Sequence, residues 1–241
     1  MKLLMLCIEC PMLADNPQEV LNYVELRDDA YYDFECSRGH RRLIVLTEPK
    51  FAVLFESGAM ALLDGYTREA VSSFAASLER FYEYWIRAVL LAGGTSPETL
   101  DACWSLVAAQ SERQFGAFCV LYQREHGRLP TVLSNKMVQF RNDVIHRGYI
   151  PPRAEVIAYA SDALKLIVNL HVELYETRYK GISTLMGIEL GRAYGRVPEG
   201  IQLSSASIAT MFTDVAGSKG QMSFEMALAE LDRRREGFYT R

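Results

Sequence analysis

Three side chains whose types suit phosphate chemistry lie within six positions of the chain, at Arg141, Asn142 and His146. An arginine guanidinium binds phosphate oxygens and stabilises the negative charge that builds on them. An amide orients neighbouring groups through neutral hydrogen bonds, and a histidine accepts or donates a proton near neutral pH. Such a set can cleave RNA without a metal ion, because the ribose 2′-OH is a nucleophile within the substrate itself.

The residues around this motif predict a helix over about 132–147, with the motif in its final turns. Gly148 follows at once and ends the helix. Asn142 and His146 are four positions apart and share one helix face. The long side chain of Arg141 must reach across from about 140° around the axis. His146 lies in the last turn, where the helix dipole favours its protonated form.

One histidine cannot readily act as base and acid in the same step. Two copies of His146 that face each other across a homodimer would supply both groups, so the chemistry favours a dimer. The spacing alone is weak evidence, because Arg-x4-His occurs by chance in many helices. The structural alternative is that Arg141 and His146 form a hydrogen-bonded pair at the helix end.

The motif Arg-Asn-x3-His, followed by Gly-Tyr-Ile-Pro inside a bundle of about four helices, resembles the HEPN superfamily. The resemblance covers about residues 49–180. The aromatic-bearing segment 65–82 is also similar to the first helices of that superfamily. On this basis Arg141, Asn142 and His146 map onto the catalytic positions of the family.

The resemblance implies a metal-independent endoribonuclease that acts on RNA, with tRNA among the candidates, at a site shared by a homodimer. It also implies a toxin–antitoxin or phage-defence role, with an antitoxin or defence protein as partner. Tyr149 lies three positions after His146, whereas HEPN toxins paired with nucleotidyltransferase antitoxins usually have tyrosine two positions after, so modification of this tyrosine is not carried over. The alternative is a non-catalytic HEPN and zinc-ribbon module that binds nucleic acid or protein.

A second set of candidate ligands lies near the amino terminus, as the pairs Cys7-x2-Cys10 and Cys36-x3-His40. Two close pairs from distant parts of the chain can enclose Zn²⁺ tetrahedrally. Because four protein ligands fill the coordination shell, the zinc would be structural and not catalytic. The alternative is a set of buried free cysteines beside a surface histidine.

Strand-forming residues over 30–36 and 41–47 place the second ligand pair at the tip of a β-hairpin, where Gly39 permits a tight turn. About 45 residues hold too little core to fold alone, and a metal would supply the missing stability. The basic residues that flank the turn either contact phosphate or form a solvated rim; they are Arg38, Arg41 and Arg42.

The chain has 241 residues and a hydrophobic content of 49%, which is typical of a globular protein. Its net charge of -4 gives no global field that attracts nucleic acid, so a polyanion site must be a local basic patch. Five cysteines, three of them clustered near a histidine, favour metal binding in a reducing compartment over disulfides. No apolar run approaches the roughly 20 residues of a membrane span. We therefore expect a cytoplasmic protein without a membrane partner.

Helical periodicity beyond residue 47 predicts a mainly α protein, with a HEPN-like helical bundle and a small amino-terminal β-hairpin zinc ribbon. The expected divisions are a zinc-ribbon-like module over 1–47, the bundle over 48–181 and a helical extension over 182–241.

Within the bundle, Thr47 is expected to cap the first helix, and Gly65 to kink or break it. Ser96 should cap a helix that runs to about Glu125. A long helix should follow Pro152 to about Lys180, and His171 on it is expected to be a satisfied structural histidine. In the extension, residues 182–195 and 222–236 should form helices, and 198–221 a loop.

Overall fold

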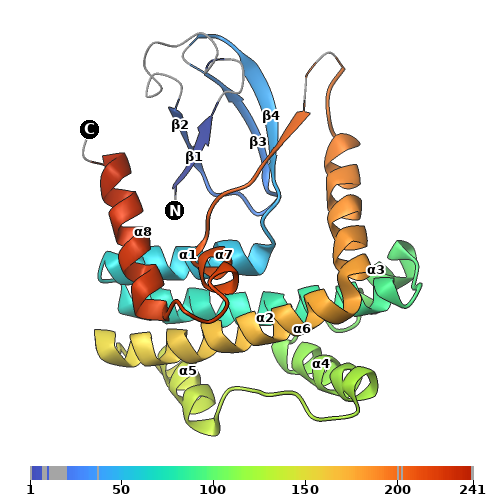
Figure 1. Cartoon of the computed structure of the whole chain (residues 1–241), viewed down its shortest axis with the longest axis vertical. Helices are drawn as coiled ribbons and strands as arrows, with labels where there is room; N and C mark the ends of the chain where they lie inside the picture. Colours follow the sequence, from blue (N-terminus) through green and yellow to red (C-terminus); the bar gives the residue numbers. More distant parts are fainter. Residues whose placement is uncertain are drawn as a thin grey trace. The chain divides into compact units, whose positions relative to one another are not determined.

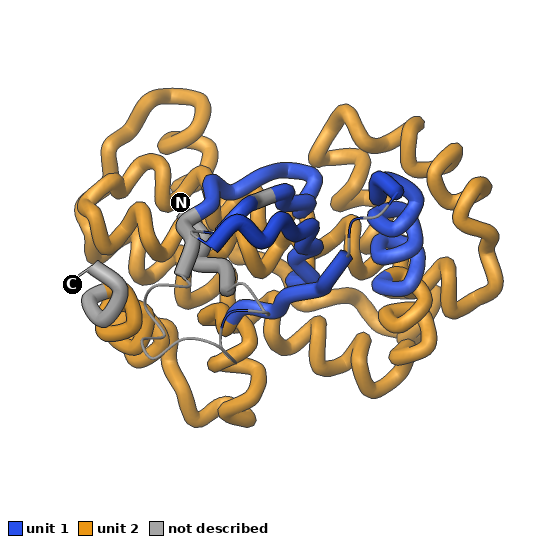
Figure 2. Tube along the Cα trace, turned by 90° about the horizontal axis from the view of Figure 1, so that it is seen from above, with its two compact units in different colours: residues 1–48, 186–208 blue, residues 49–185, 209–241 orange. Residues whose placement is uncertain are grey.

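The computed structural model describes residues 2–6, 10, 21–36, 38–199, 201 and 203–239, and it is mainly helical (Figure 1). The chain forms two compact units, and each combines two separate stretches of sequence (Figure 2). We call Met1–Glu48 with Met186–Ile208 the strand unit, and Pro49–Leu185 with Ala209–Arg241 the helix unit. Residues 182–241, which the sequence led us to expect as one extension, thus contribute to both units.

The strand unit contains a two-stranded antiparallel ribbon and a three-stranded sheet. The ribbon pairs β1 with β2, and the sheet has the order β3-β4-β5. The strands are β1 (Lys2–Leu6), β2 (Leu21–Glu25), β3 (Tyr31–Glu35), β4 (Arg41–Leu46) and β5 (Leu203–Ala206). The antiparallel pairing of β3 with β4 confirms the predicted hairpin, with Glu35 opposite Arg41 next to the turn.

The strand β5 corrects the expectation that 198–221 is a loop. It pairs parallel to β4, with Leu43 opposite Leu203. Thr47 extends this pairing, because its backbone N–H donates to the carbonyl of Ala206 at 2.9 Å and its hydroxyl donates to the same oxygen at 3.1 Å. The expected helix cap at Thr47 is therefore wrong: its side chain serves the sheet, and the next helix begins after Pro49 without a side-chain cap.

The helix unit is built around two long helices, α2 and the first part of α6. Its helices are α1 (Lys50–Leu63), α2 (Thr67–Ala92), α3 (Pro97–Ser105), α4 (Ser111–His126), α5 (Asn135–Arg147), α6 (Arg153–Tyr194), α7 (Met211–Gly217) and α8 (Phe224–Tyr239). From Met186 onward, α6 belongs to the strand unit. None of the helices in the described part of the chain combines the length and apolar character that crossing a bilayer requires.

The predicted breaks between helices are partly confirmed. Gly65 has a φ of +84°, a left-handed conformation that glycine adopts without strain, and it separates α1 from α2. Ser96 caps α3 as predicted, since its hydroxyl accepts the N–H of Thr99 at 3.2 Å. That helix ends at Ser105 and does not continue to Glu125, so one predicted helix is two.

A kink in α6 lets it approach α2 closely. Arg178 leaves helical geometry, with a φ of -137°, near the predicted end of the long helix. Beyond it, a Cβ added at Gly181 would lie 1.9 Å from the backbone oxygen of Ala88 on α2. No other residue type fits there, so this contact between two backbones depends on a glycine.

Aromatic side chains fill the core of the helix unit and surround His171. Phe51 packs edge-on against Phe81 at 5.1 Å between ring centroids, and Tyr84 stacks on His171 at 5.9 Å. Burial lowers the pKa of His171 to about 4. Its Nδ1 atom is buried without a hydrogen-bond partner among the described residues, so the expectation of a satisfied histidine is wrong. The ring contributes through packing.

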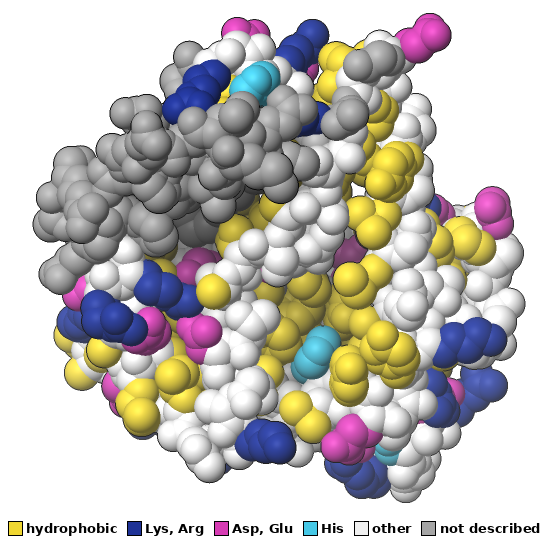
Figure 3. Space-filling view, turned by 45° about the horizontal axis from the view of Figure 1, so that its top comes forward, with side chains coloured by type: hydrophobic (Ala, Val, Ile, Leu, Met, Phe, Trp, Pro, Cys, Tyr) yellow, Lys and Arg dark blue, Asp and Glu magenta, His cyan; other side chains and the backbone are white. Residues whose placement is uncertain are grey.

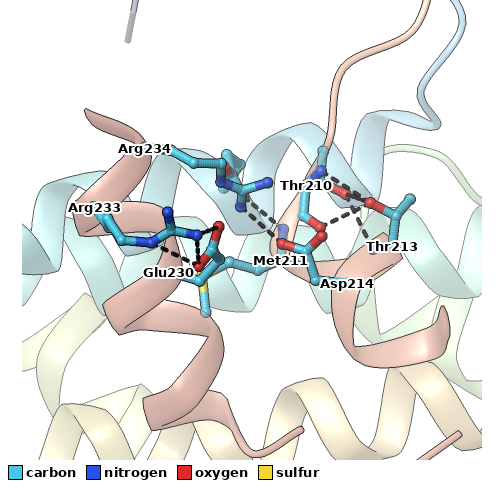
Figure 4. Close-up of polar contacts among 8 residues, drawn as sticks. Thr210, Met211, Thr213, Asp214, Glu230, Arg233 and Arg234 are labelled. Carbon is cyan, nitrogen blue, oxygen red and sulfur yellow. Dashed lines mark hydrogen bonds and ion pairs between the residues drawn. The ribbon is translucent and has the colours of Figure 1, made fainter. Parts of the chain in front are cut away.

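Polar contacts join α7 and α8 to the rest of the helix unit. Figure 4 shows Arg234 of α8 directed at Asp214 of α7, a pair with 2.8 Å between nitrogen and oxygen. The buried carboxylate of Glu56, on α1, accepts the N–H of Met211 at the start of α7 at 2.8 Å. Burial raises the pKa of Glu56 to about 7, against the opposing effects of the Met211 N–H and of Arg234.

This raised pKa predicts that Glu56 weakens the fold as pH increases. An unfolded glutamate ionises near its ordinary pKa, whereas folded Glu56 holds its proton to about pH 7. Stability from this group is therefore full below the unfolded pKa and is lost as pH rises through the folded one. Relative to wild type, Glu56→Gln should gain about 2–3 kcal/mol of unfolding free energy between about pH 5 and pH 8.

Denaturant unfolding of both proteins at each pH measures this gain. Glu176, which is exposed, provides the control. Its replacement by glutamine should change the unfolding free energy by the same amount at each pH. A pH-independent difference for Glu56→Gln would contradict the raised pKa.

Candidate functional site

The helix α5 holds the predicted phosphate-binding motif. Ser134 caps its start, since its hydroxyl accepts the N–H of Met137 at 3.4 Å. Gly148 ends it in the left-handed conformation, with a φ of +72°. The N–H groups of Gly148 and Tyr149 both donate to the carbonyl of Asp143. The predicted helix end is confirmed, and it fixes the last turn that carries His146.

Arg141 is anchored on both sides. One terminal nitrogen, Nη2, forms an ion pair with the carboxylate of Glu79 on α2, and Nη1 donates to Oδ1 of Asn142 at 3.0 Å. The Arg141 side chain is 21% exposed and that of Glu79 is 29% exposed, so both are shielded but reachable from solvent. Tyr159 lies buried beside them, and burial raises the pKa of its phenol while Arg141 opposes that effect. The guanidinium of Arg141 is therefore fixed in position, and it keeps N–H groups that neither Glu79 nor Asn142 engages.

His146 lies at the exposed end of the motif. The neighbouring Val144 is fully buried and fixes the opposite face of the last turn. His146 itself is exposed and has no hydrogen-bonding partner among the described residues. The structure thus joins Arg141 to Asn142 directly but brings neither into hydrogen-bond contact with His146. The imidazole is open to a ligand or to a second protein.

Glu79 is the member of this site that the sequence did not identify. It lies in α2, 62 positions before Arg141, among charged residues on the polar side of an amphipathic helix. Nothing in the local sequence distinguishes it from Glu83, which pairs instead with Arg80 and Arg87. Only the packing of α5 against α2 selects it.

A second site lies in the turn between β3 and β4. Cys10, Cys36 and His40 come together there, and their candidate ligand atoms all lie within 4.8 Å of one another. Gly39, with a φ of +81°, allows the tight turn in which its N–H donates to the carbonyl of Cys36 at 2.9 Å. These three residues could hold a metal ion. The fourth predicted ligand, Cys7, lies outside the described residues.

The ligand separations fit one tetrahedral ion. The two sulfur atoms are 3.7 Å apart, and Nδ1 of His40 lies 3.4 Å from the sulfur of Cys10 and 3.5 Å from that of Cys36. A tetrahedral ion with bonds of about 2.3 Å to sulfur and about 2.0 Å to nitrogen spaces two sulfurs by about 3.8 Å and sulfur from nitrogen by about 3.5 Å. A disulfide would bring the sulfurs to about 2.05 Å, so the cysteines are not bonded to each other.

Two of the three basic residues beside this turn are engaged or shielded, and the third, Arg38, is exposed. Arg41 pairs with Asp33 across the hairpin, with both carboxylate oxygens engaged, and Arg42 is buried. On the described part of the face in Figure 3, basic and acidic side chains are interspersed. This distribution agrees with the small net charge of the chain.

Comparison of the chain with protein-family models, curated proteins and solved structures gives no match. The likeness of the α5 motif to the HEPN superfamily therefore stays a prediction.

The metal site gives a direct prediction. Protein purified without chelator should carry about one equivalent of metal per chain, and Cys10→Ser and Cys36→Ser should each lower that content severalfold, because each removes one buried thiolate from the shell. Elemental analysis of the intact proteins measures the content. Cys103 is exposed and lies in α3, so Cys103→Ser is the matched control and should keep the metal. Full metal content in all three variants would exclude this site.

Proposed function

We propose that this protein is a metal-independent endoribonuclease of the HEPN type, with Arg141, Asn142 and His146 as its catalytic residues. One observation carries the proposal: the helix α5 presents both an anchored, partly exposed guanidinium and an exposed imidazole. Arg141 would bind the scissile phosphate, Asn142 would orient it through its free amide nitrogen, and His146 would transfer a proton. The ribose 2′-OH would attack phosphorus and release a 5′-hydroxyl end.

The proposed active form is a homodimer in which two copies of α5 face each other. Apolar side chains exposed on α5 and on the segments that flank it support this arrangement; they are Leu129, Val132, Val138, Tyr149 and Ile150. Ile150 lies four positions after His146, and its side chain is 73% exposed. A second copy would cover such residues and would bring two imidazoles towards one substrate.

The amino-terminal metal is proposed to be zinc with a structural role, held by Cys10, Cys36, His40 and Cys7. Two thiolates and an imidazole at tetrahedral spacing are the ligands that zinc prefers in structural sites. The ion would stabilise the turn between β3 and β4 and take no part in RNA cleavage. A role of the whole protein in a toxin–antitoxin or phage-defence system belongs to the same proposal.

The second candidate is a non-catalytic module that binds nucleic acid or protein. The contact that favours it is the ion pair of Arg141 with Glu79, since a purely structural arginine would look the same. The two candidates differ in whether the exposed His146 is required for any activity.

Cleavage of cellular RNA tests the proposal. Wild-type protein incubated with total RNA and with tRNA should produce fragments that end in a 2′,3′-cyclic phosphate. His146→Ala and Arg141→Ala should lower the rate by roughly 10²–10⁴-fold, which is the typical contribution of an acid–base or charge-stabilising group. EDTA should leave the rate unchanged while the protein stays folded.

Arg147→Ala is the matched control, because Arg147 is the next residue, is 73% exposed and, among the described residues, pairs only with Asp143 of its own helix. It should retain cleavage. Equal cleavage by wild type and His146→Ala, or none by either, would exclude the ribonuclease. Sedimentation of the same samples measures the dimer, and a stable monomer with full activity would contradict the shared site.

A further inference from the structure

The ion pair between Glu79 and Arg141 has a consequence for the order of proton transfers. The proposed ribonuclease needs a group that takes the proton of the 2′-OH and a group that gives a proton to the departing 5′-oxygen. Two histidines from two protomers were one way to supply both. A carboxylate beside the phosphate-binding arginine is another, and it lies within the same copy of the chain.

The contacts leave the required atoms available. Oε1 of Glu79 accepts from Nη2 of Arg141, and no described residue forms a hydrogen bond with Oε2. Arg141 has five N–H donors. Apart from the contacts to Glu79 and Asn142, its remaining donors face no hydrogen-bond acceptor among the described residues. The side chain of Glu79 is 29% exposed, so a substrate hydroxyl can reach it.

This arrangement matches the geometry of the reacting group. In RNA the 2′-oxygen and the non-bridging phosphate oxygens lie side by side around one phosphorus. A phosphate bound by the free donors of Arg141 would place its own 2′-OH near the carboxylate of Glu79, which binds the same guanidinium. The ion pair also holds the carboxylate of Glu79 in the position from which it would accept a proton.

We infer that Glu79 is the general base of the proposed ribonuclease and that His146 is its general acid, an inference that rests on the proposed function. The 2′-OH loses its proton to Oε2 of Glu79, and the 2′-oxygen forms a bond to phosphorus. The bond from phosphorus to the 5′-oxygen breaks, and that oxygen takes a proton from the imidazolium of His146. The products are a 2′,3′-cyclic phosphate and a 5′-hydroxyl, and exchange with water restores both residues.

A simpler role for Glu79 would be to hold Arg141 in place. Glutamine distinguishes the two roles, because its side-chain oxygen can still accept from Arg141 but cannot take up a proton at neutral pH. If Glu79 only positions Arg141, Glu79→Gln retains the wild-type rate and pH profile. If Glu79 is the base, the same variant loses the rate although Arg141 remains bound.

The test compares two RNAs with the same sequence, chosen from those that the wild type cleaves. The second RNA has sulfur in place of the scissile 5′-oxygen, so its leaving group departs without protonation. Glu79→Gln should lower single-turnover cleavage of both RNAs by roughly 10²–10⁴-fold. His146→Ala should be equally impaired on the natural RNA but should regain most of the rate on the sulfur-substituted RNA.

Controls separate this inference from the proposed function. Glu69, on the same helix and 57% exposed, should tolerate glutamine without loss of rate. Glu79→Asp keeps a carboxylate and should recover part of the rate, and thermal unfolding of each variant reports whether it folds. A Glu79→Gln rate within a few fold of wild type, with His146→Ala inactive, would overturn the base while the ribonuclease stands. A wild type that cleaves no RNA would overturn both.

Discussion

The ion pair between Arg141 and Glu79 is the contact on which the candidate site depends. Across the thirteen residues of α5, all of them described, Val144 is the one that is buried. Few buried side chains therefore fix the position of α5, and the shielded charge pair adds a specific contact between α5 and α2. One partner, Arg141, is the residue proposed to bind phosphate. The same ion pair therefore joins α5 to α2 and positions the guanidinium.

The rest of the helix unit provides a rigid support for this pair. Glu79 lies in the middle of α2, whose inner face carries large buried aromatic residues such as Phe74 and Trp85. The close approach of Gly181 to Ala88 fixes α6 against the same helix. Since α2 is packed on several sides, the carboxylate of Glu79 has a fixed position from which it binds the guanidinium. His146 in the last turn of α5 and Ile150 just beyond the helix are both exposed, so they can meet a substrate or a second copy.

The strand unit depends on a different kind of stabilisation. Its strands are short, and β5 joins β4 from a distant part of the chain. The cluster of Cys10, Cys36 and His40 brings residue 10 to the hairpin turn, and a bound ion would replace hydrophobic core that so few residues cannot supply. The two candidate sites thus differ in physical character, since one can be closed around a metal and the other is open to solvent.

Features that local sequence determines could be predicted, whereas features that depend on tertiary packing could not. The hairpin of β3 and β4, the cap at Ser96 and the helix end at Gly148 follow from strand formers, a hydroxyl cap and a left-handed glycine. The strand β5 was missed because Leu-Ser-Ser-Ala carries no strand signal and gains its partner only through tertiary structure. Glu79 was missed for a similar reason: its partner is 62 residues away, and no spacing rule connects two helices. The proposed chemistry itself rests on residue types and on the resemblance of the motif, which the fold neither requires nor excludes.

Mapping of RNA ends in cells is the sharpest test of the proposed ribonuclease. RNA from cells expressing wild type or His146→Ala would be sequenced with a method selective for 2′,3′-cyclic phosphate ends. The proposed ribonuclease should produce new ends at recurrent positions, in tRNA or another RNA class, in wild-type cells alone. Identical profiles of ends in the two cultures, at equal levels of folded protein, would contradict it.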